Sequence, residues 1–250
     1  MMADQFMGDR ASTPRRTMIG AVDIGGTKIA AGMVDTAGRV LARAECPTAP
    51  ERGFADALAR IVALLQETGE QAGGTLCGIG IGCTGPVDPM NGTIGNVEFL
   101  TGWEGAELVA ELSRRFDRPA AMENDADAAA LAEARWGAGR GASKFVYVTI
   151  STGIGGGLVI DGQLYRGVNG AHPEIGHHII DPSGPACACG ARGCWESLAS
   201  GPALASWFNA RFSAVPGSAE ILDARRICAL AERGDPHALA AVDREVYYLG

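Results

Sequence analysis

A repeated pattern of strands and glycine turns constrains the fold of this chain more than any other feature. Residues 18–43 read MIGAVDIGGTKIAAGMVDTAGRVLAR, and residues 145–166 read FVYVTISTGIGGGLVIDGQLYR. Each copy begins with an apolar run rich in β-branched residues. It then turns through glycines beside a threonine and continues as a second and a third strand joined by a short turn. This duplicated unit predicts two similar lobes that face each other.

The segments between and after the repeats carry alternating patterns of helices and strands. The first group comprises a helix over 54–68, a buried strand over 76–83, a helix over 106–116, a strand over 120–122 and a helix over 126–136. Such alternation predicts an α/β sheet with helices on its faces. The chain then becomes helical, with expected helices over 198–212, 219–232 and 236–249.

Composition and charge narrow the class of protein. Hydrophobic residues make up 47% and charged residues 20% of the 250 residues, as is typical of a soluble globular protein. The net charge of −8 argues against non-specific binding of nucleic acid. No apolar run approaches the roughly 18 residues of a membrane helix, and the N-terminal segment lacks the apolar core of a signal peptide. We therefore expect a cytoplasmic protein without nucleic-acid or membrane partners.

The same patterns predict where the lobes begin and end. Residues 1–17 are polar and are expected to form a disordered tail. The small-residue segment 137–143 (GAGRGAS) is the expected linker, so the N-terminal lobe spans 18–136 and the C-terminal lobe 137–250. The final helical pattern runs to Gly250, which is interpreted either as a helix stop or as the end of a shortened chain.

The cysteines are unevenly distributed along the chain. There are seven, an odd number, and three of them lie within residues 187–194. This distribution does not fit the disulfide framework of a secreted protein. Cys77 and Cys83 fall in an apolar strand pattern, which predicts free, buried thiols.

The three clustered cysteines follow a histidine with metal-ligand spacing. His177, Cys187, Cys189 and Cys194 form the pattern H-x9-C-x-C-x4-C. Three thiolates and one imidazole suit Zn²⁺, and four protein ligands leave no open position, so the pattern predicts a structural zinc site in the loop 177–194. The alternatives are His178 as the histidine ligand, or a cluster of reduced thiols without metal.

Two carboxylates flank this loop. Glu174 lies three residues before His177, and Glu196 lies two residues after Cys194. Exposed carboxylates are usually only solvated, but a folded metal loop would bring these two together. We therefore interpret them as candidate acceptors for the hydroxyl groups of a sugar.

Each repeat carries a turn suited to phosphate. In Asp23-Ile24-Gly25-Gly26-Thr27-Lys28, glycine lets the backbone approach an anion, and Asp23 can hold Mg²⁺ through water. A plain hairpin turn is the alternative for this motif alone. Ser151–Gly157 supplies the second turn, and two matched turns fit a nucleotide held between two lobes. Neither is a Walker or a Rossmann motif, because no helix follows at the required spacing.

The segment Glu123-Asn124-Asp125 follows a short strand and precedes a helix. Asn124 and Asp125 can serve simply as helix caps. Acidic groups and an amide at the carboxyl end of a strand also describe a hydroxyl-binding site with a general base. The residues alone leave both interpretations open.

Together these motifs resemble the ROK family (repressors, uncharacterised reading frames and kinases) of sugar kinases, over about residues 18–208. The matching segments are AVDIGGTK (21–28), GIGCTGPVD (80–88), ENDADAAALAEA (123–134), STGIGGG (151–157), HPEIGHH (172–178) and CACGARGCWESLASG (187–201). The resemblance implies an actin-like (RNase H-like) ATPase fold with two lobes around a cleft. It also implies transfer of the γ-phosphoryl group of Mg-ATP to the 6-hydroxyl of a hexose, most directly glucose.

The resemblance also assigns roles by motif position. Asp125 corresponds to the catalytic base. Residues that correspond to sugar contacts are Gly85, Asn124, Asp125, Glu174, His177 and Glu196, with His177 shared between zinc and sugar. Residues that correspond to the binding of the ATP phosphates are Asp23, Gly25, Gly26, Thr27, Lys28, Thr152, Gly153, Gly155 and Gly156. Such a site suits a reaction that needs positioning and charge neutralisation more than covalent chemistry.

The sequence departs from the family pattern in two ways. Family members usually continue some tens of residues further, so we expect the C-terminal part of the second lobe to be missing. We would then expect an incomplete adenine site and an uncovered apolar face on the second lobe. Activity would be weak, or a partner would cover the gap. His172-Pro173 precedes Glu174, as in fructokinase-like relatives, whereas the complete Cys-x-Cys-Gly-x2-Gly-Cys signature favours glucose.

Several alternatives stay open on the sequence. Fructose, N-acetylmannosamine or N-acetylglucosamine are alternative substrates, and polyphosphate is an alternative donor. A catalytically impaired sugar-binding fragment is a further possibility. A sugar-sensing repressor is disfavoured, because only 17 residues precede the first strand and the charge is wrong for DNA. A homodimer is the default expectation.

Overall fold

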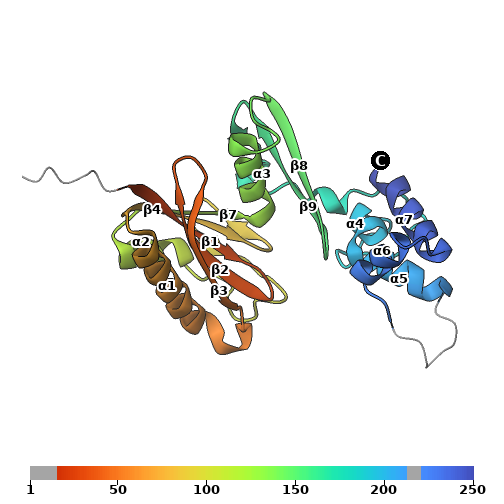
Figure 1. Ribbon diagram of the computed structural model, residues 1–250, viewed down its shortest axis with the longest axis horizontal. Coiled ribbons are helices and arrows are strands. Elements are labelled where there is room, and N and C mark those ends of the chain that lie inside the picture. Colours follow the sequence, from red (N-terminus) through yellow and green to blue (C-terminus); the bar gives the residue numbers. More distant parts are fainter. Residues whose placement is uncertain (1–15, 213–220) are drawn as a thin grey trace, which may run out of the picture. The chain divides into compact units, whose positions relative to one another are not determined.

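The computed structural model describes residues 16–212 and 221–250 (Figure 1). The expected tail, residues 1–17, therefore lies outside the described residues except for its last two. The chain divides into two compact units, Met1–Asp125 and Ala126–Gly250. The lobe boundary expected at 137–143 stays a prediction.

A five-stranded sheet forms the centre of the first unit, with the strand order β3-β2-β1-β4-β7. Its strands are β1 (Thr17–Ile24), β2 (Lys28–Asp35), β3 (Val40–Pro47), β4 (Thr75–Cys83) and β7 (Ala120–Asn124). The first three form an antiparallel meander, and β4 and β7 run parallel to β1. The first repeat thus folds as the strand–turn–strand–turn–strand unit that its sequence predicts.

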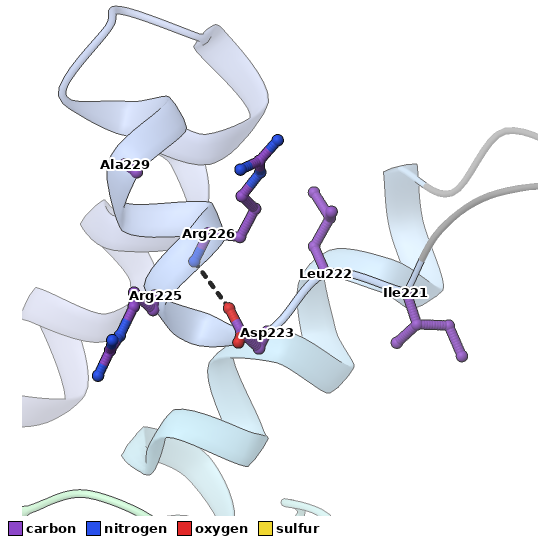
Figure 2. A pocket seen from close by; sticks show the side chains of 6 residues that line it. All are labelled: Ile221, Leu222, Asp223, Arg225, Arg226 and Ala229. Atoms are coloured by element: carbon purple, nitrogen blue, oxygen red, sulfur yellow. Dashed lines mark hydrogen bonds between the residues drawn. The ribbon is translucent and has the colours of Figure 1, made fainter.

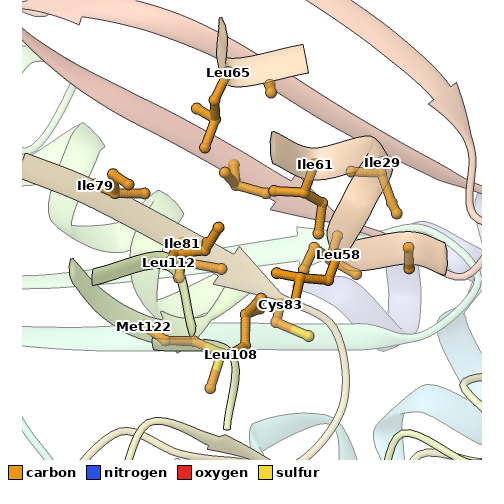
Figure 3. Packing of buried hydrophobic residues seen from close by; sticks show 14 of the residues in the cluster. Ile29, Leu58, Ile61, Leu65, Ile79, Ile81, Cys83, Leu108, Leu112 and Met122 are labelled. Atoms are coloured by element: carbon orange, nitrogen blue, oxygen red, sulfur yellow. The ribbon is translucent and has the colours of Figure 1, made fainter. Parts of the chain in front are cut away.

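Helices cover one face of this sheet. They are α1 (Gly53–Ala72), preceded by the short helix η1 (Pro50–Arg52), and α2 (Leu108–Phe116). In α1 the buried side chains recur at helical spacing, and Leu58, Ile61 and Leu65 belong to the apolar cluster between this helix and the sheet (Figure 3). A short hairpin of β5 (Val87–Asp88) and β6 (Thr93–Ile94), which the sequence does not predict, follows β4.

The second unit begins with α3 (Asp125–Trp136), whose first residue belongs to the first unit. A three-stranded sheet follows in the order β10-β9-β8, built from β8 (Lys144–Ile150), β9 (Ile154–Ile160) and β10 (Gln163–Leu164). This is the second repeat, folded as expected. The short helices η2 (Val168–Gly170) and η3 (Ile175–His177) then lead into the cysteine loop.

Four helices complete the described chain. They are α4 (Trp195–Ala199), α5 (Gly201–Phe212), α6 (Ala224–Ala231) and α7 (Pro236–Leu249). The last three share a small apolar core of Leu204, Phe208, Ile227, Ala238 and Ala241. Asp223 and Asp235 cap α6 and α7 by accepting hydrogen bonds from backbone N–H groups of the first turn.

Three expectations differ from the structure. The expected helix 198–212 is divided at Ser200, because this residue is extended and the N–H of Gly201 donates to the carbonyl of Ser151. The expected helix 219–232 starts at Ala224 instead, and residues 219 and 220 lie outside the described residues. Cys83 is buried as expected, but Cys77 is exposed, because the β1–β4 register shifts between Leu76 and Gly78 and leaves Cys77 out of the pairing.

No helix among residues 16–212 and 221–250 has the length and apolar character needed to cross a bilayer.

Truncation of the α1 core contact should destabilise the first unit. Ile61 is fully buried, so Ile61→Ala should lower the free energy of unfolding by about 3 kcal/mol through lost burial and a cavity. Denaturant unfolding monitored by circular dichroism measures this change. Gln66→Ala, at an exposed position of the same helix, should stay within about 0.5 kcal/mol of the parent chain. Equal effects of the two substitutions would contradict the packing of Ile61 in the core.

Candidate functional site

The carboxyl ends of three parallel strands gather one group of predicted site residues. The register aligns Ile24 of β1 with Cys83 of β4 and Cys83 with Asn124 of β7. The N–H of Thr84 donates to the carbonyl of Ile24 at 2.9 Å, so the chain stays paired as it leaves the sheet. Asp23, Gly85, Asn124 and Asp125 therefore lie along one edge of the first unit, where α/β sheets place ligand sites.

Gly85 and Asn124 support each other at this edge. The side-chain amide of Asn124 is buried and donates to the carbonyl of Gly85 at 3.2 Å. Gly85 has a φ of +76°, and a Cβ atom there would lie 2.6 Å from Val97 Cγ2. A larger residue would therefore be strained and would clash. Asn124 is consequently more than a helix cap, because it ties β7 to the loop after β4.

Two carboxylates give this edge a negative potential. Loss of hydration raises the pKa of Asp23, the charge of Asp125 raises it further, and Lys28 and Arg43 oppose both effects. Burial, together with Asp125 and Asp23, raises the pKa of the Cys83 thiol to about 12. The side chain of Asp125 is exposed at the start of α3. An arrangement of this kind favours a bound cation.

Two hydrogen bonds hold the first glycine turn in place. The N–H of Gly25 donates to the carbonyl of Lys28 at 2.9 Å, and the hydroxyl of the buried Thr48 donates to the carbonyl of Gly25 at 2.7 Å. A Cβ atom at Gly26 would lie 2.8 Å from the Phe99 ring. Lys28 is exposed and lies 3.4 Å from Glu45. The turn is therefore accessible, with the ammonium group of Lys28 beside it.

The second glycine turn connects β8 to β9. The N–H of Ser151 donates to the carbonyl of Gly153 at 2.8 Å, and Thr152 is exposed at the tip. The N–H of Ile154 donates to Glu196 Oε2 at 3.0 Å, and a Cβ atom at Gly153 would collide with that carboxylate. Glu196, which sequence reasoning assigns to the sugar, thus also fixes the turn assigned to phosphate.

Glycines let η3 approach β9 closely. A Cβ atom at Gly176 would collide with the carbonyl of Ile154, and one at Gly156 would collide with Ile175 and with the carbonyl of Tyr147. The backbones of η3 and β9 can approach this closely only because glycine has no side chain at these positions. It places Glu174 and His177, which flank Ile175 and Gly176, beside the second turn.

The predicted metal ligands lie together. The ligand atoms of His177, Cys187, Cys189 and Cys194 are all within 4.8 Å of one another. His177 Nδ1 lies 3.5 Å from Cys187 Sγ, and Cys189 Sγ lies 3.6 Å from Cys194 Sγ. A tetrahedral site with Zn–S bonds near 2.3 Å requires sulfur–sulfur distances of roughly 3.8 Å. The donor set and its spacing therefore fit Zn²⁺, and the neighbouring His178 is exposed outside the cluster.

Two glycines shape the cysteine loop. Gly190 has a φ of +92° and Gly193 a φ of +71°. The loop closes through hydrogen bonds from the N–H of Cys187 to the carbonyl of Ala191 and from the N–H of Gly193 to the carbonyl of Pro185, each 2.8 Å long. A Cβ atom at Gly193 would collide with the carbonyl of Asp181. These turns return Cys194 to the other ligands and start α4, which carries Glu196.

The structure also contains groups that sequence reasoning missed. Asp127 is buried in α3, and its Oδ2 lies 2.7 Å from Nδ1 of His172. The available signal was an acidic residue placed between alanines in the segment ENDADAAA. Thr48, which braces the first turn, gave no comparable signal.

A pocket of about 540 Å³ adjoins the second turn and α7. Its lining includes Thr152, Gly201, Leu204, Cys228 and Glu245. Burial raises the pKa of Glu245 to about 7, against the opposing charge of Arg244. Its Oε2 is buried without a hydrogen-bond partner among the described residues.

Another pocket, of about 440 Å³, lies at the start of α6 (Figure 2). It is lined by Ile221, Leu222, Asp223, Arg225, Arg226 and Ala229, none of which is a predicted site residue. Asp223 faces the helix and accepts a hydrogen bond from the N–H of Arg226 at 2.8 Å.

The predicted residues therefore form two groups. Asp23, the first turn, Gly85, Asn124 and Asp125 lie in the first unit. The second turn, Glu174, Glu196 and the metal cluster lie in the second.

Comparison with known sequences shows to which protein family this chain is related. Residues 19–250 match the ROK family. The chain belongs to the ROK family. It is 36% identical to the glucokinase of Thermotoga maritima, over 93% of this chain and 75% of that protein. It is 39% identical to the glucokinase of Streptomyces coelicolor, over 80% of this chain but 62% of that protein. An N-acetylmannosamine kinase of Shigella boydii is 36% identical over 92% of this chain and 75% of that protein.

Solved structures confirm the α/β fold class of this ROK protein. A ROK hexokinase from Thermus thermophilus is 37% identical with a TM-score of 0.79, over 92% of this chain and 74% of that one. A ROK glucokinase from Streptomyces griseus, in complex with glucose and AMPPNP, is 35% identical with a TM-score of 0.76, over 92% and 76%. The resemblance that the motifs indicate is thus confirmed at the level of the family.

Glu245 should make stability depend on pH. Its pKa is raised from 4.5 to about 7 in the folded chain, so the folded state holds a proton that the unfolded state releases, and stability falls as the pH rises through this range. Glu245→Gln should therefore stabilise the ROK protein by about 1–2 kcal/mol at pH 8 and have little effect at pH 4.5. Thermal unfolding at several pH values measures this, with the exposed Glu232→Gln as the control. An effect of Glu245→Gln that does not vary with pH would contradict the assignment.

Proposed function

We propose that this ROK protein transfers the γ-phosphoryl group of Mg-ATP to the 6-hydroxyl of glucose. The observation that carries the proposal is the position of Asp23, Gly85, Asn124 and Asp125 at the carboxyl ends of the three parallel strands β1, β4 and β7. Two carboxylates, a buried amide and an open glycine turn are what binding of a hydroxyl and a metal-bound phosphate requires. The similarity to glucokinases supports the choice of substrate.

Asp125 is the proposed catalytic base. Its carboxylate is exposed at the first residue of α3, directly after Asn124 has been fixed by its bond to Gly85. From that position Asp125 would accept the proton of the sugar hydroxyl as the hydroxyl oxygen attacks phosphorus. Asn124 and the Gly85 loop would orient the sugar beside it, and Glu174, His177 and Glu196 would accept or donate hydrogen bonds to its other hydroxyls.

The two glycine turns are the proposed phosphate sites. Gly25, Gly26 and Thr27 form an open turn on the first repeat, with Lys28 as a nearby cation, and Thr152–Gly156 form its counterpart on the second. Asp23, whose pKa is raised in part by Asp125, would gain most from a divalent cation. Mg²⁺ would supply neutralisation of charge on the phosphates. The pocket beside Thr152 would take the rest of the nucleotide.

The metal cluster has a structural role in this proposal. His177, Cys187, Cys189 and Cys194 would hold Zn²⁺ with no open position, so the metal supplies cross-linking of the loop. The loop in turn holds η3 and the start of α4, which carry Glu174, His177 and Glu196. Zinc would therefore set sugar affinity through the shape of the pocket.

Phosphorylation of N-acetylmannosamine is the second candidate, because a kinase with that name is as similar to the chain as a glucokinase is. A coupled assay of ADP release with glucose, N-acetylmannosamine, N-acetylglucosamine and fructose ranks the substrates. The highest kcat/KM is expected with glucose. Absence of glucose-dependent ADP release, with turnover of another sugar, would overturn the choice of substrate. Replacing ATP by polyphosphate tests the donor in the same way.

Removing the proposed base should abolish turnover without abolishing sugar binding. Asp125→Asn should lower kcat by about 10³-fold or more, while the glucose Kd stays within a few-fold, because the amide cannot take the proton. ADP release and isothermal titration measure the two quantities. Asp117→Asn, at an exposed aspartate after α2, should leave both unchanged. Retained turnover by the Asp125 variant would refute the assignment.

Loss of one metal ligand should release zinc. Cys189→Ser should lose its metal at a chelator concentration at which the parent chain keeps it, because a closed site depends on all four ligands. Metal content by mass spectrometry, followed by a glucose titration, measures the loss and the expected weaker sugar binding. Cys77→Ser, at a free exposed cysteine of the first unit, is the matched control. Full zinc retention by the Cys189 variant would disprove the ligand set.

A further inference from the structure

A buried pair of side chains joins α3 to the segment that carries Glu174. His172 Nδ1 lies 2.7 Å from Asp127 Oδ2, and the two side chains are 16% and 3% exposed. A carboxylate only accepts hydrogen bonds, so the ring nitrogen donates. The pair lies outside the metal cluster, and no role assigned above uses it.

The aspartate end of the pair is held rigidly. Asp127 lies in the first turn of α3, two residues after Asp125. A Cβ atom at Gly157 of β9 would lie 2.6 Å from Ala130 Cβ and 2.9 Å from Asp127 Oδ1. Helix α3 therefore packs directly on the backbone of β9, and Figure 1 shows the two elements side by side. Asp127 is fixed by the same strand that carries the second glycine turn.

The histidine end controls a short segment. Gly176 rests against the carbonyl of Ile154, and this contact fixes one end of residues 172–177 on β9. His172 fixes the other end on α3. Between them the N–H of Ile175 donates to the carbonyl of Pro173 at 2.9 Å, and Glu174 projects as an exposed side chain. The direction of Glu174 is thus determined by these two anchors, and the His172–Asp127 bond is a polar contact between side chains.

We propose that His172 and Asp127 are positioning residues that set the affinity of the protein for its hexose by orienting Glu174. The inference rests on the proposed function, in which Glu174 accepts hydrogen bonds from sugar hydroxyls. Neither residue touches the sugar. The pair acts by holding the backbone from which Glu174 projects at a fixed place relative to α3.

The chemistry of the pair makes it sensitive to substitution. Asp127 Oδ1 is buried without a hydrogen-bond partner among the described residues. Removal of His172 would therefore leave a buried carboxylate without its ring donor, and the segment would have to move to let water reach it. An asparagine side chain, in contrast, places its amide nitrogen close to where Nδ1 of histidine lies and can donate in its place.

The first experiment compares variants of His172 in the full chain by isothermal titration. His172→Leu should weaken glucose binding about tenfold, leave the affinity for a non-hydrolysable ATP analogue within about twofold and leave the zinc content unchanged. His172→Asn should bind glucose nearly as the parent chain does. Equal glucose affinity for His172→Leu and the parent, or equal weakening by both variants, would overturn the proposal.

A double-mutant cycle tests whether His172 acts through Glu174. Glu174→Gln alone should weaken glucose binding, and adding His172→Leu should weaken it no further, because the residue being positioned is already lost. Additive losses would overturn the positioning role.

The aspartate of the pair is tested by Asp127→Asn. Its matched control is Asp35→Asn, because Asp35 is also buried and is paired to Arg39 at 2.7 Å in the first unit. Only the Asp127 substitution should change glucose affinity.

Hydrogen exchange separates this inference from the proposed function. If the parent chain binds none of the four sugars, the proposed function fails, but the anchoring of the segment can still be measured. The amides of Ile175 and His177, which donate within the segment, should exchange about tenfold faster in His172→Leu than in His172→Asn. Unchanged exchange in His172→Leu would overturn the anchoring itself.

Discussion

The parallel pairing of β1, β4 and β7 determines where the chemistry of the first unit lies. Because the register aligns Ile24, Cys83 and Asn124, the segments that follow the three strands leave the sheet at the same edge. Gly85, with its positive φ, follows β4, and the exposed Asp125 opens α3 directly after β7. A shift of one residue in either pairing would turn these side chains to the opposite face.

The second unit depends on a different constraint, which is direct contact between backbones. Gly156 and Gly176 let η3 lie against β9, and Gly157 lets α3 pack on the same strand. Strand β9 therefore supports the second glycine turn, Glu174 and the cysteine loop. The N–H of Ile154, at the start of that strand, binds the carboxylate of Glu196. The groups assigned to sugar, phosphate and metal are therefore mechanically connected within this unit.

Electrostatics favours a bound cation at one place in each unit. Loss of hydration and the charge of Asp125 raise the pKa of Asp23, and burial together with the charges of Asp125 and Asp23 raises the pKa of the Cys83 thiol to about 12. In the second unit, burial and the neighbouring cysteines raise the pKa of Cys194 to about 12. A metal ion at each place would offset these costs, Mg²⁺ with its oxygen ligands in the first and Zn²⁺ with its sulfur ligands in the second.

The repeats, the α/β class, the family and the four members of the metal cluster could all be predicted from the amino-acid sequence, because strand periodicity, glycine turns and ligand spacing are local patterns. The sequence also placed Asp125 and Asn124 at the start of a helix. The folded structure was needed to show that Glu196 binds the second turn, that Asn124 binds Gly85, that Cys77 is exposed and that His172 contacts Asp127, 45 residues away. These contacts join separate elements, and their partners are chosen by register and by the close approach of backbones, which no local pattern contains.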